Sequence, residues 1–364
     1  MRYCNNLLAR VCLVIAASAF SNYTLAKDDP FIPPPAADTL TFKEVKKTFK
    51  IVDDVEGALE LHNRILIGNY RVGFNVAKSS YAREEGGQTR EDMGGGWERV
   101  TSYKDQDLRA TAMLQGVNSE DLNRITEKAY QDLISRLQAA GREVVTMDQI
   151  KDSKVIAEEL ELAKLDSKGE YWTNFGIGSA REMMIVTWPK SIPLWFMFGD
   201  TLDAGASFKA AYNALKQKNF GFLKRISGEQ NAAMVDISVT VRFADTWSQR
   251  SKTLRKAKVG VDPNMKITLN KIGFSSAKVT RIGTFPGPSG TMNQLKDGQG
   301  FGMGNDWANY SLDTKNEESW TSVGQTLELV VTAEPGKMEE QVLKALYAVN
   351  AAIAAAAKEY PAKK

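Results

Sequence analysis

The chain has 364 residues, with 47 Lys and Arg against 44 Asp and Glu, a single histidine and two cysteines. This near balance of charge lacks the basic excess typical of nucleic-acid binding, so we expect no nucleic-acid partner. So few His and Cys residues exclude a zinc site built from several of them, and we expect no metal and no cofactor.

Residues 1–26 have the pattern of a secretory signal peptide. Arg2 and Arg10 form a basic start, and an apolar run from Val11 to Phe20 follows that is too short to span a bilayer. Thr24-Leu25-Ala26 is typical of a cleavage site. The alternative is an uncleaved anchor.

Cleavage would remove Cys4 and Cys12, so the mature chain would carry no thiol. It would also take Lys and Arg from 47 to 45 against 44 acids, which gives a charge of +1. No later stretch approaches ~20 continuous apolar residues, so membrane contact is at most peripheral. We expect export to the periplasm, to the outer-membrane periphery or out of the cell.

Residues 27–40 are rich in proline and predict an extended tether; a disordered leader is the alternative. Residues 41–225 predict an α/β layer. Its first strand ends in Tyr70, Val72, Phe74 and Val76, which alternate with other residues as in a half-covered strand.

A long helix from Ser119 and a short strand, Glu143–Thr146, form the centre of this layer. Ser119 is the expected N-cap, and Gly141 is placed to end the helix in the left-handed conformation. Apolar residues at spacings of three and four predict one buried helix face, made of Leu122, Ile125, Ala129, Leu133 and Leu137.

Two stretches rich in glycine predict long loops, at residues 77–117 and 285–307. The first contains Gly94-Gly95-Gly96 before Trp97, and residues 97–103 have enough strand character to hide a hairpin. Aromatic residues in or beside glycine-rich segments can bind a partner, and we select Trp97, Trp172, Phe301 and Trp307. The alternative is that each aromatic packs its loop onto the body of the protein.

Residues 226–364 predict antiparallel strands and a closing helix, continuous with the first region or separate from it. Val235 to Phe243 alternate strictly with polar residues, which indicates one buried and one wet face. The helix is expected from Pro335 to Tyr360, with a buried stripe of Val342, Leu346, Val349 and Ile353. The predicted fold class is α/β (α+β), a mixed sheet flanked by helices.

Catalytic residues are scarce in this chain. A Ser-His-Asp triad would have to use His62, which lies in an apolar helical pattern and is better explained as structural. Adjacent acids such as Glu317-Glu318 point in different directions and do not form a catalytic pair. The Gly176-to-Arg181 segment lacks the third small position of a dinucleotide fingerprint.

The strand ending at Val76, the helix Ile125–Leu137, the Ala140–Val145 turn and strand, and a helix expected from Ser153 to Leu165 follow one another in order. This order resembles the periplasmic α/β domain of the curli-secretion and penicillin-binding-protein-activator lipoproteins. The chain departs from them because it lacks a lipidated cysteine and because a long loop separates its first strand from the helix. The resemblance implies a non-catalytic, oligomeric protein at the outer membrane.

We therefore expect an exported envelope protein of the binding or assembly type, with an envelope protein or a second copy as its partner. Two alternatives stay open. One is an extracytoplasmic hydrolase that uses two carboxylates on glycans, which requires acids held roughly 5–10 Å apart. The other is a periplasmic protein that binds a small molecule in an apolar pocket.

Overall fold

The computed structural model describes residues 31–150, 152–153, 170–177, 180–192, 222–251, 256–280, 283–319 and 322–363. The predicted signal peptide, the start of the tether and nearly all of the helix expected from Ser153 lie outside these residues. From Phe31 onward the described residues form one compact unit.

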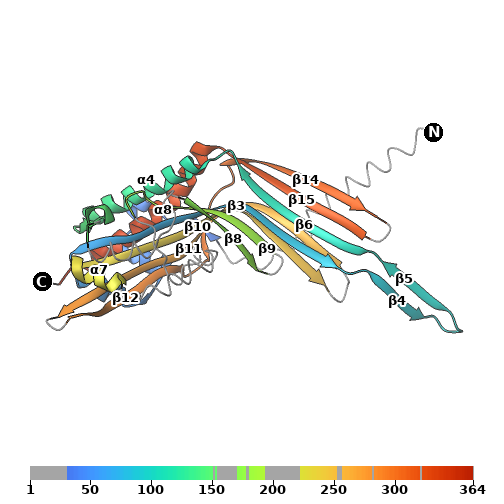
Figure 1. The fold of residues 1–364 in the computed structure, drawn as a ribbon, viewed down its shortest axis with the longest axis horizontal. Coiled ribbons are helices and arrows are strands. Elements are labelled where there is room, and N and C mark those ends of the chain that lie inside the picture. The colour runs from blue at the N-terminus through green and yellow to red at the C-terminus, as the bar shows by residue number, and fades with distance from the viewer. Residues whose placement is uncertain are drawn as a thin grey trace. The chain divides into compact units, whose positions relative to one another are not determined.

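The described strands form one mixed sheet of thirteen strands and a separate ribbon of two. The sheet contains β1 Phe31–Ile32, β2 Phe49–Asp53, β3 Arg64–Glu84, β6 Asp105–Gln115, β7 Glu143–Val145, β8 Glu170–Ile177, β9 Ala180–Thr187, β10 Ala232–Ser251, β11 Lys256–Thr280, β12 Gly283–Leu295, β13 Gly300–Gly302, β14 Ala308–Glu318 and β15 Ser322–Ala333. The ribbon contains β4 Gly87–Asp92 and β5 Glu98–Tyr103. The main strand order is β1-β13-β11-β10-β3-β6-β15-β14 (Figure 1).

The predicted mixed α/β fold class is confirmed, and its two halves are interleaved in one sheet. β10 and β11, and β14 and β15, are antiparallel as expected for the C-terminal region. However, β10 pairs in parallel with β3, and β15 pairs in parallel with β6. The C-terminal strands are therefore neighbours of the N-terminal strands in the same sheet.

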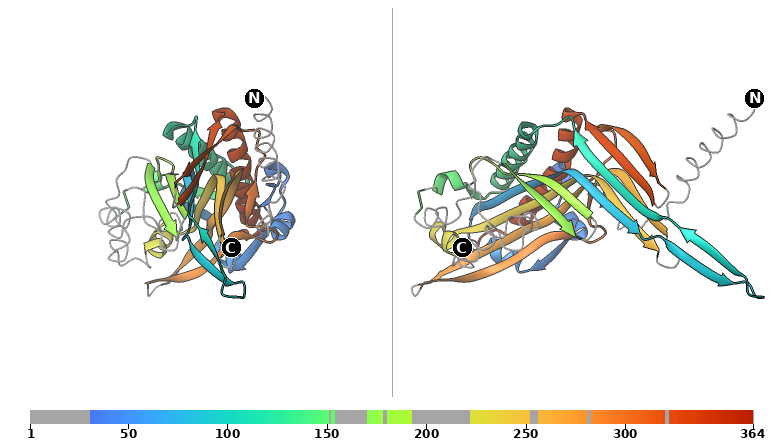
Figure 2. Two further views of the ribbon diagram at one scale, coloured as in Figure 1. Left: turned by 90° about the vertical axis from the view of Figure 1, so that its right-hand side faces the viewer. Right: turned by 45° about the vertical axis from the view of Figure 1, so that its right-hand side comes forward.

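The described helices are α2 Phe42–Thr48, α3 Val55–Glu60, α4 Ser119–Ala139, α7 Phe222–Gln230 and α8 Pro335–Glu359, with short 3-10 turns at Ala37–Thr39 and Met147–Ile150. The two long helices, α4 and α8, lie together over one face of the sheet (Figure 2). Every residue of their two predicted apolar stripes is buried, as expected.

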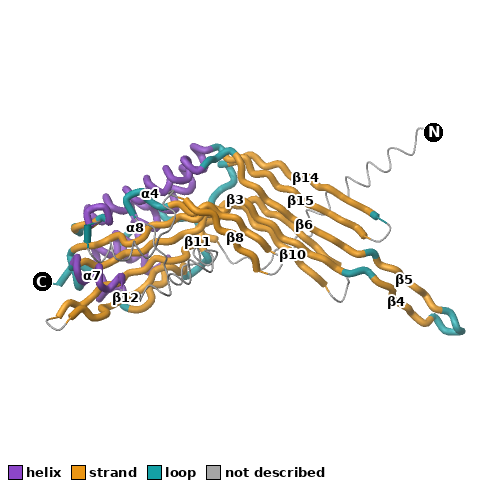
Figure 3. The backbone as a smooth tube through the Cα atoms, in the orientation of Figure 1, coloured by secondary structure: helices purple, strands orange, loops and turns teal. Residues whose placement is uncertain are grey.

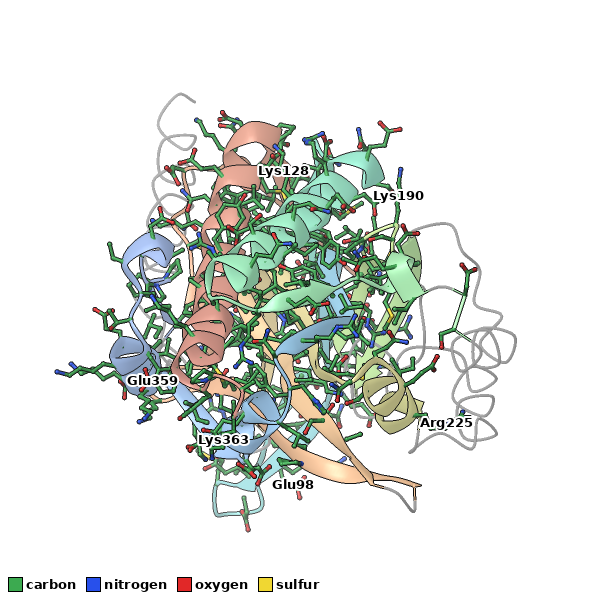
Figure 4. The ribbon with its side chains drawn as sticks, turned by 90° about the vertical axis from the view of Figure 1, so that its left-hand side faces the viewer. Glu98, Lys128, Lys190, Arg225, Glu359 and Lys363 are labelled. Carbon is green, nitrogen blue, oxygen red and sulfur yellow. The ribbon has the colours of Figure 1, made fainter. Side chains whose placement is uncertain are left out.

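A polar bridge joins these two helices to the sheet. Asn350 of α8 donates to the carbonyl of Ala129 in α4 at 2.7 Å and accepts from the Tyr70 hydroxyl of β3 at 3.3 Å. Burial raises the pKa of Tyr70. At the surface, Lys128 of α4 forms an ion pair with Glu339 of α8 at 2.5 Å; Figure 4 labels Lys128 beside the two helices.

The N-terminal end of α4 differs from the prediction, and its C-terminal end matches it. The N-cap is Asn118, because its side chain accepts from the Asp121 amide at 3.0 Å while Asp121 reaches back to Asn118. Ser119 is the first helical residue rather than the cap. Gly141 ends the helix with φ of 84°, and its amide donates to the carbonyl of Gln138.

Arg142 follows this turn and holds the C-terminal ends of two other helices. Its buried guanidinium donates to the carbonyls of Leu59 and His62, just at and beyond the end of α3, at 3.1 and 2.9 Å. It also donates to the carbonyls of Ala357 and Tyr360 at the end of α8. These carbonyls lack helical partners and carry the negative end of each helix dipole, so one cation satisfies both ends. Burial lowers the pKa of Arg142.

Replacing Arg142 with Met should destabilise the protein because four carbonyls lose their donor in a buried setting. We expect the free energy of unfolding to fall by about 3 kcal/mol or more in urea titration. Arg109→Met, at an exposed position on β6, is the matched control and should change it by less than about 0.5 kcal/mol. Equal effects of the two variants would contradict the role of Arg142.

The long strands divide the sheet into two parts. β10 pairs with β3 as far as Val241 and Phe74, and from Ala77 onward β6 takes the place of β10 beside β3. We call this separation the fork. The part covered by α4 and α8 is the body, and the strands beyond the fork, with the ribbon, are the extension (Figure 3).

The far ends of β10 and β11 pack against the face of β3 and β6 in the extension. Ala82 of β3, Leu108 of β6 and Ala257 of β11 form a small buried cluster there. This cluster is separate from the main core, which lies around the two long helices. The extension therefore buries little apolar surface of its own.

The two long loops expected from glycine content are largely β-structure. Residues 77–117 contain the end of β3, the ribbon and β6. The suggested hairpin is therefore confirmed, and the prediction of a long loop is wrong. Residues 285–307 contain most of β12 and all of β13. The glycines of β13 serve close packing, because a Cβ at Gly300 would lie 2.2 Å from the Ile267 carbonyl oxygen of β11.

Gly300→Ala should therefore force β13 away from β11. We expect a loss of about 1–3 kcal/mol in the free energy of unfolding, measured by urea titration. Gly336→Ala is the control, since a Cβ there meets nothing within 4 Å in the first turn of α8, and it should be neutral or slightly stabilising. Unchanged stability of Gly300→Ala would argue against a closely packed β13.

Candidate interaction site

The single histidine has a structural position. His62 is 7% exposed, and its Nε2 lies 3.0 Å from the carbonyl oxygen of Ala277 in β11. Its own carbonyl accepts from Arg142. Across the described part of the chain, no group of three or more His, Cys, Asp or Glu side chains is placed to hold a metal ion.

Trp97 lies at the tip of the β4–β5 ribbon and is 77% exposed. Met93, on the other side of the tip, is 60% exposed. Between them Gly94, Gly95 and Gly96 all have positive φ, at 82°, 67° and 82°, which other residues adopt only with strain. The Met93 amide donates to the Trp97 carbonyl at 2.9 Å and closes the turn. We call residues 93–97 the ribbon tip.

The ribbon that carries this tip has no buried residue in either strand. β4 and β5 pair in continuous register from Gly87 and Tyr103 to Asp92 and Glu98. Arg90 and Glu98 form an exposed ion pair at 3.3 Å, a type that adds little stability. An isolated two-stranded ribbon is marginal in water, so burial on a partner would stabilise it.

Trp172, the second predicted anchor, lies in β8 opposite Ile185 of β9. It is thus on a sheet strand, remote in topology from the ribbon tip. In the described part of the chain, β8 pairs only with β9.

Phe301 and Trp307 are core residues, which corrects the prediction that they bind a partner. Both are fully buried. The Phe301 ring packs edge-on to Phe49 with centroids 6.1 Å apart, and the Trp307 ring packs on Tyr310 at 6.3 Å. The flanking glycines, from which a loop was expected, allow β13 to approach its neighbours and carry Phe301 inward.

Within the body, neither face of β10 is exposed to solvent, contrary to the expectation from its alternation of apolar and polar residues. Asp236, Ser238 and Thr240 are at most 4% exposed. Asn270 of β11 donates to the Thr240 hydroxyl at 2.8 Å. Arg71 of β3 lies opposite Ser238 and is also fully buried. The polar side of these strands is therefore a polar layer inside the protein. In the sequence, only the presence of alternating polar residues on both β3 and β10 could have indicated it.

A charged cluster lies at the fork, and sequence reasoning did not find it. Lys78 of β3 is 9% exposed and pairs with Glu182 of β9 and Asp245 of β10, each at 3.0 Å. Lys266 of β11 pairs with the other oxygen of Asp245 at 2.6 Å. Burial opposes ionisation of Asp245, but Lys78 and Lys266 outweigh it and lower its pKa. The cluster bonds β10 to β3 where their backbone pairing has ended.

Asp245→Asn should destabilise the protein, since Lys78 stays buried with one carboxylate fewer. We expect a loss of about 2–4 kcal/mol at pH 7 in urea titration. Because folding lowers the pKa of Asp245, its contribution is complete above the unfolded value of about 4 and disappears as pH falls through the folded value.

The difference between wild type and Asp245→Asn should therefore shrink as pH falls below about 4. Asp107→Asn, at an exposed position on β6, is the control and should change stability little at either pH. A difference that stays constant down to pH 2 would contradict an ionised Asp245 in the cluster.

One face of the extension is charged and hollowed over β3, β6, β15 and β14. The hollow is open and has a volume of about 750 Å³. Lys104 donates to Glu318 at 2.7 Å, and this hydrogen bond and the lysine charge lower the pKa of Glu318. The side chains that line the hollow are mostly charged and include Arg83, Asp105, Asp107, Arg109, Lys315 and Glu317.

No protein-family model matches the chain, and no curated protein or solved structure is significantly similar to it. Among the described residues, no helix has both the length and the apolar character needed to cross a membrane.

Proposed function

We propose that the chain is an exported bacterial envelope protein that works by binding a partner through the ribbon tip. The observation that carries the proposal is the position of Trp97 and Met93, two large apolar side chains exposed on a ribbon with no buried residue. Tryptophan is enriched among the residues that dominate interface energies. The predicted signal peptide supports the location, because export would bring the ribbon into contact with envelope components.

The shape of the tip favours insertion into a recess of a partner protein. Three glycines keep the backbone narrow there, so Trp97 and Met93 are the bulk of the surface it offers. The strands behind the tip are charged and polar, with Arg90, Glu91, Asp92 and Glu98 close to it. An apolar centre with a polar rim is the usual anatomy of a protein interface.

The two alternatives receive less support from the described residues. A hydrolase acting on glycans needs a general acid with a raised pKa, whereas that of Glu318 in the charged hollow is lowered. A small-molecule binder needs a mainly apolar pocket, and the hollow is lined by charged side chains. The resemblance to curli-secretion and penicillin-binding-protein-activator proteins, and with it the outer-membrane location, stays a prediction.

The double variant Trp97→Ala, Met93→Ser tests the proposal. We expect binding to envelopes of the producing bacterium, measured by co-sedimentation of the exported protein, to weaken by about tenfold or more. The thermal unfolding midpoint should not change, because neither side chain is buried.

Glu359→Ala, at the exposed end of α8, is the control and should bind as wild type does (Figure 4). Equal envelope binding by the tip variant and the wild type would refute the proposed role of the ribbon tip.

A further inference from the structure

β14 lies at one edge of the described sheet. In the part of the chain that the structure describes, β14 pairs with β15 alone and ends the sheet (Figure 1). Its pairing with β15 is regular over eleven residues, from Ala308 to Glu318, without a bulge. It contains no proline, and residues 311–318 are all exposed. Such an edge is a template for a further strand.

The charges on β14 decide which strand can pair there. Asp313, Lys315 and Glu317 lie on one face of the strand, because side chains alternate. Charges on an edge strand usually prevent pairing. On β14, however, their order is such that opposite charges face each other when two copies of the strand lie antiparallel. We infer that β14 pairs antiparallel with β14 of a second copy of this chain, around a two-fold axis at Thr314.

With the axis at Thr314, Asp313 of each copy lies directly opposite Lys315 of the other. Opposite charges at directly facing positions stabilise an antiparallel pair. Moving the axis by one residue places Asp313 opposite Asp313, or Lys315 opposite Lys315, and either pairing is unfavourable. Moving it to Leu312 leaves no opposite charges facing each other. An axis at Asn316 places Lys315 opposite Glu317, but then only residues 314–318 of β14 pair, against residues 310–318 with the axis at Thr314. The charge order therefore disfavours the adjacent registers, and the length of the strand favours the axis at Thr314.

The other face of β14 also fits this arrangement. Leu312 is 52% exposed and shares its face with Tyr310 and Thr314. In the proposed register Leu312 of each copy lies opposite Asn316 and diagonal to Thr314 of the other, so the exposed side chain gains neighbours. About nine residues of each strand take part, which corresponds to a small, reversible interface. The sheet would continue from β15 and β14 of one copy into β14 and β15 of the next.

This surface is separate from the ribbon tip, so the inference does not depend on the proposed envelope partner. Loss of envelope binding in the tip variant would leave the β14 pairing intact. Equally, a chain that fails to self-associate could still bind the envelope through Trp97. The two proposals can fail independently.

Charge exchange tests the inference, measured by sedimentation velocity of the exported protein over a range of concentrations. Asp313→Lys places two lysines opposite each other, and Lys315→Asp places two aspartates, so each variant should associate about tenfold more weakly than wild type. The double exchange Asp313→Lys, Lys315→Asp restores opposite charges and should recover association to within about threefold of wild type.

The fold should survive these changes, because Asp313 and Lys315 are exposed and the ion pair of Lys315 with Glu328 is at the surface. Unchanged circular dichroism and thermal midpoints would confirm this. A wild type that stays monomeric at all concentrations, or a double exchange no better than the single variants, would overturn the inference. Association of all four proteins with equal strength would show that another surface is used.

Cysteine cross-linking tests the register itself, in a chain with Cys4 and Cys12 replaced by Ser. Thr314→Cys should form a disulfide-linked dimer on mild oxidation, because facing Cβ atoms about 5 Å apart are within reach of a disulfide. Leu312→Cys and Asn316→Cys are matched controls two residues away and should cross-link much less. Preferential linking of either control would contradict an axis at Thr314.

Discussion

The ion pairs of Lys78 with Glu182 and Asp245 are the interaction on which the shape of the sheet depends. β10 is bonded to β3 through the backbone in the body and leaves it after Val241. Beyond this point only side chains join the two strands, and Lys78 is buried there. Without its carboxylates, that buried charge would have no compensation, and the fork would open or the strands would rearrange.

The fork explains why the two parts of the protein differ in what they offer to partners. In the body, α4 and α8 cover the sheet, and Asn350 and Arg142 satisfy polar groups that the packing encloses. Among the described residues no helix covers the strands of the extension, and the small cluster around Leu108 is separate from the main core. Backbone edges and the ribbon are left for contacts with other molecules.

Local patterns in the sequence predicted what local physics decides. The stripe beginning at Leu122 and the stripe beginning at Val342 are both buried, because a helical period can be recognised without knowledge of the partner surface. Gly141 ends its helix as expected, since positive φ depends on the backbone alone. The exposed position of Trp97 also agrees with its glycine-rich neighbours, because the three glycines form the turn itself.

Long-range contacts decided the features that the sequence did not predict. Phe301 is buried because Gly300 approaches Ile267 of β11, which lies more than thirty residues earlier in the chain, and the same glycines out of context suggest a loop. The polar face of β10 was expected to be wet because its alternation does not show that β3 carries matching polar residues. Lys78 and Asp245 are far apart in sequence, and neither stands in a motif.

Hydrogen exchange of wild type and Asp245→Asn by mass spectrometry tests most directly whether the fork holds the extension to the body. We predict that exchange in the variant accelerates by a larger factor in β6, β15 and the far halves of β10 and β11 than in α4 and α8, because the extension also opens as a unit of its own, whereas the helices exchange only through global unfolding. Equal acceleration in the helices and the extension would contradict it, since the cluster would then stabilise the whole protein rather than the junction.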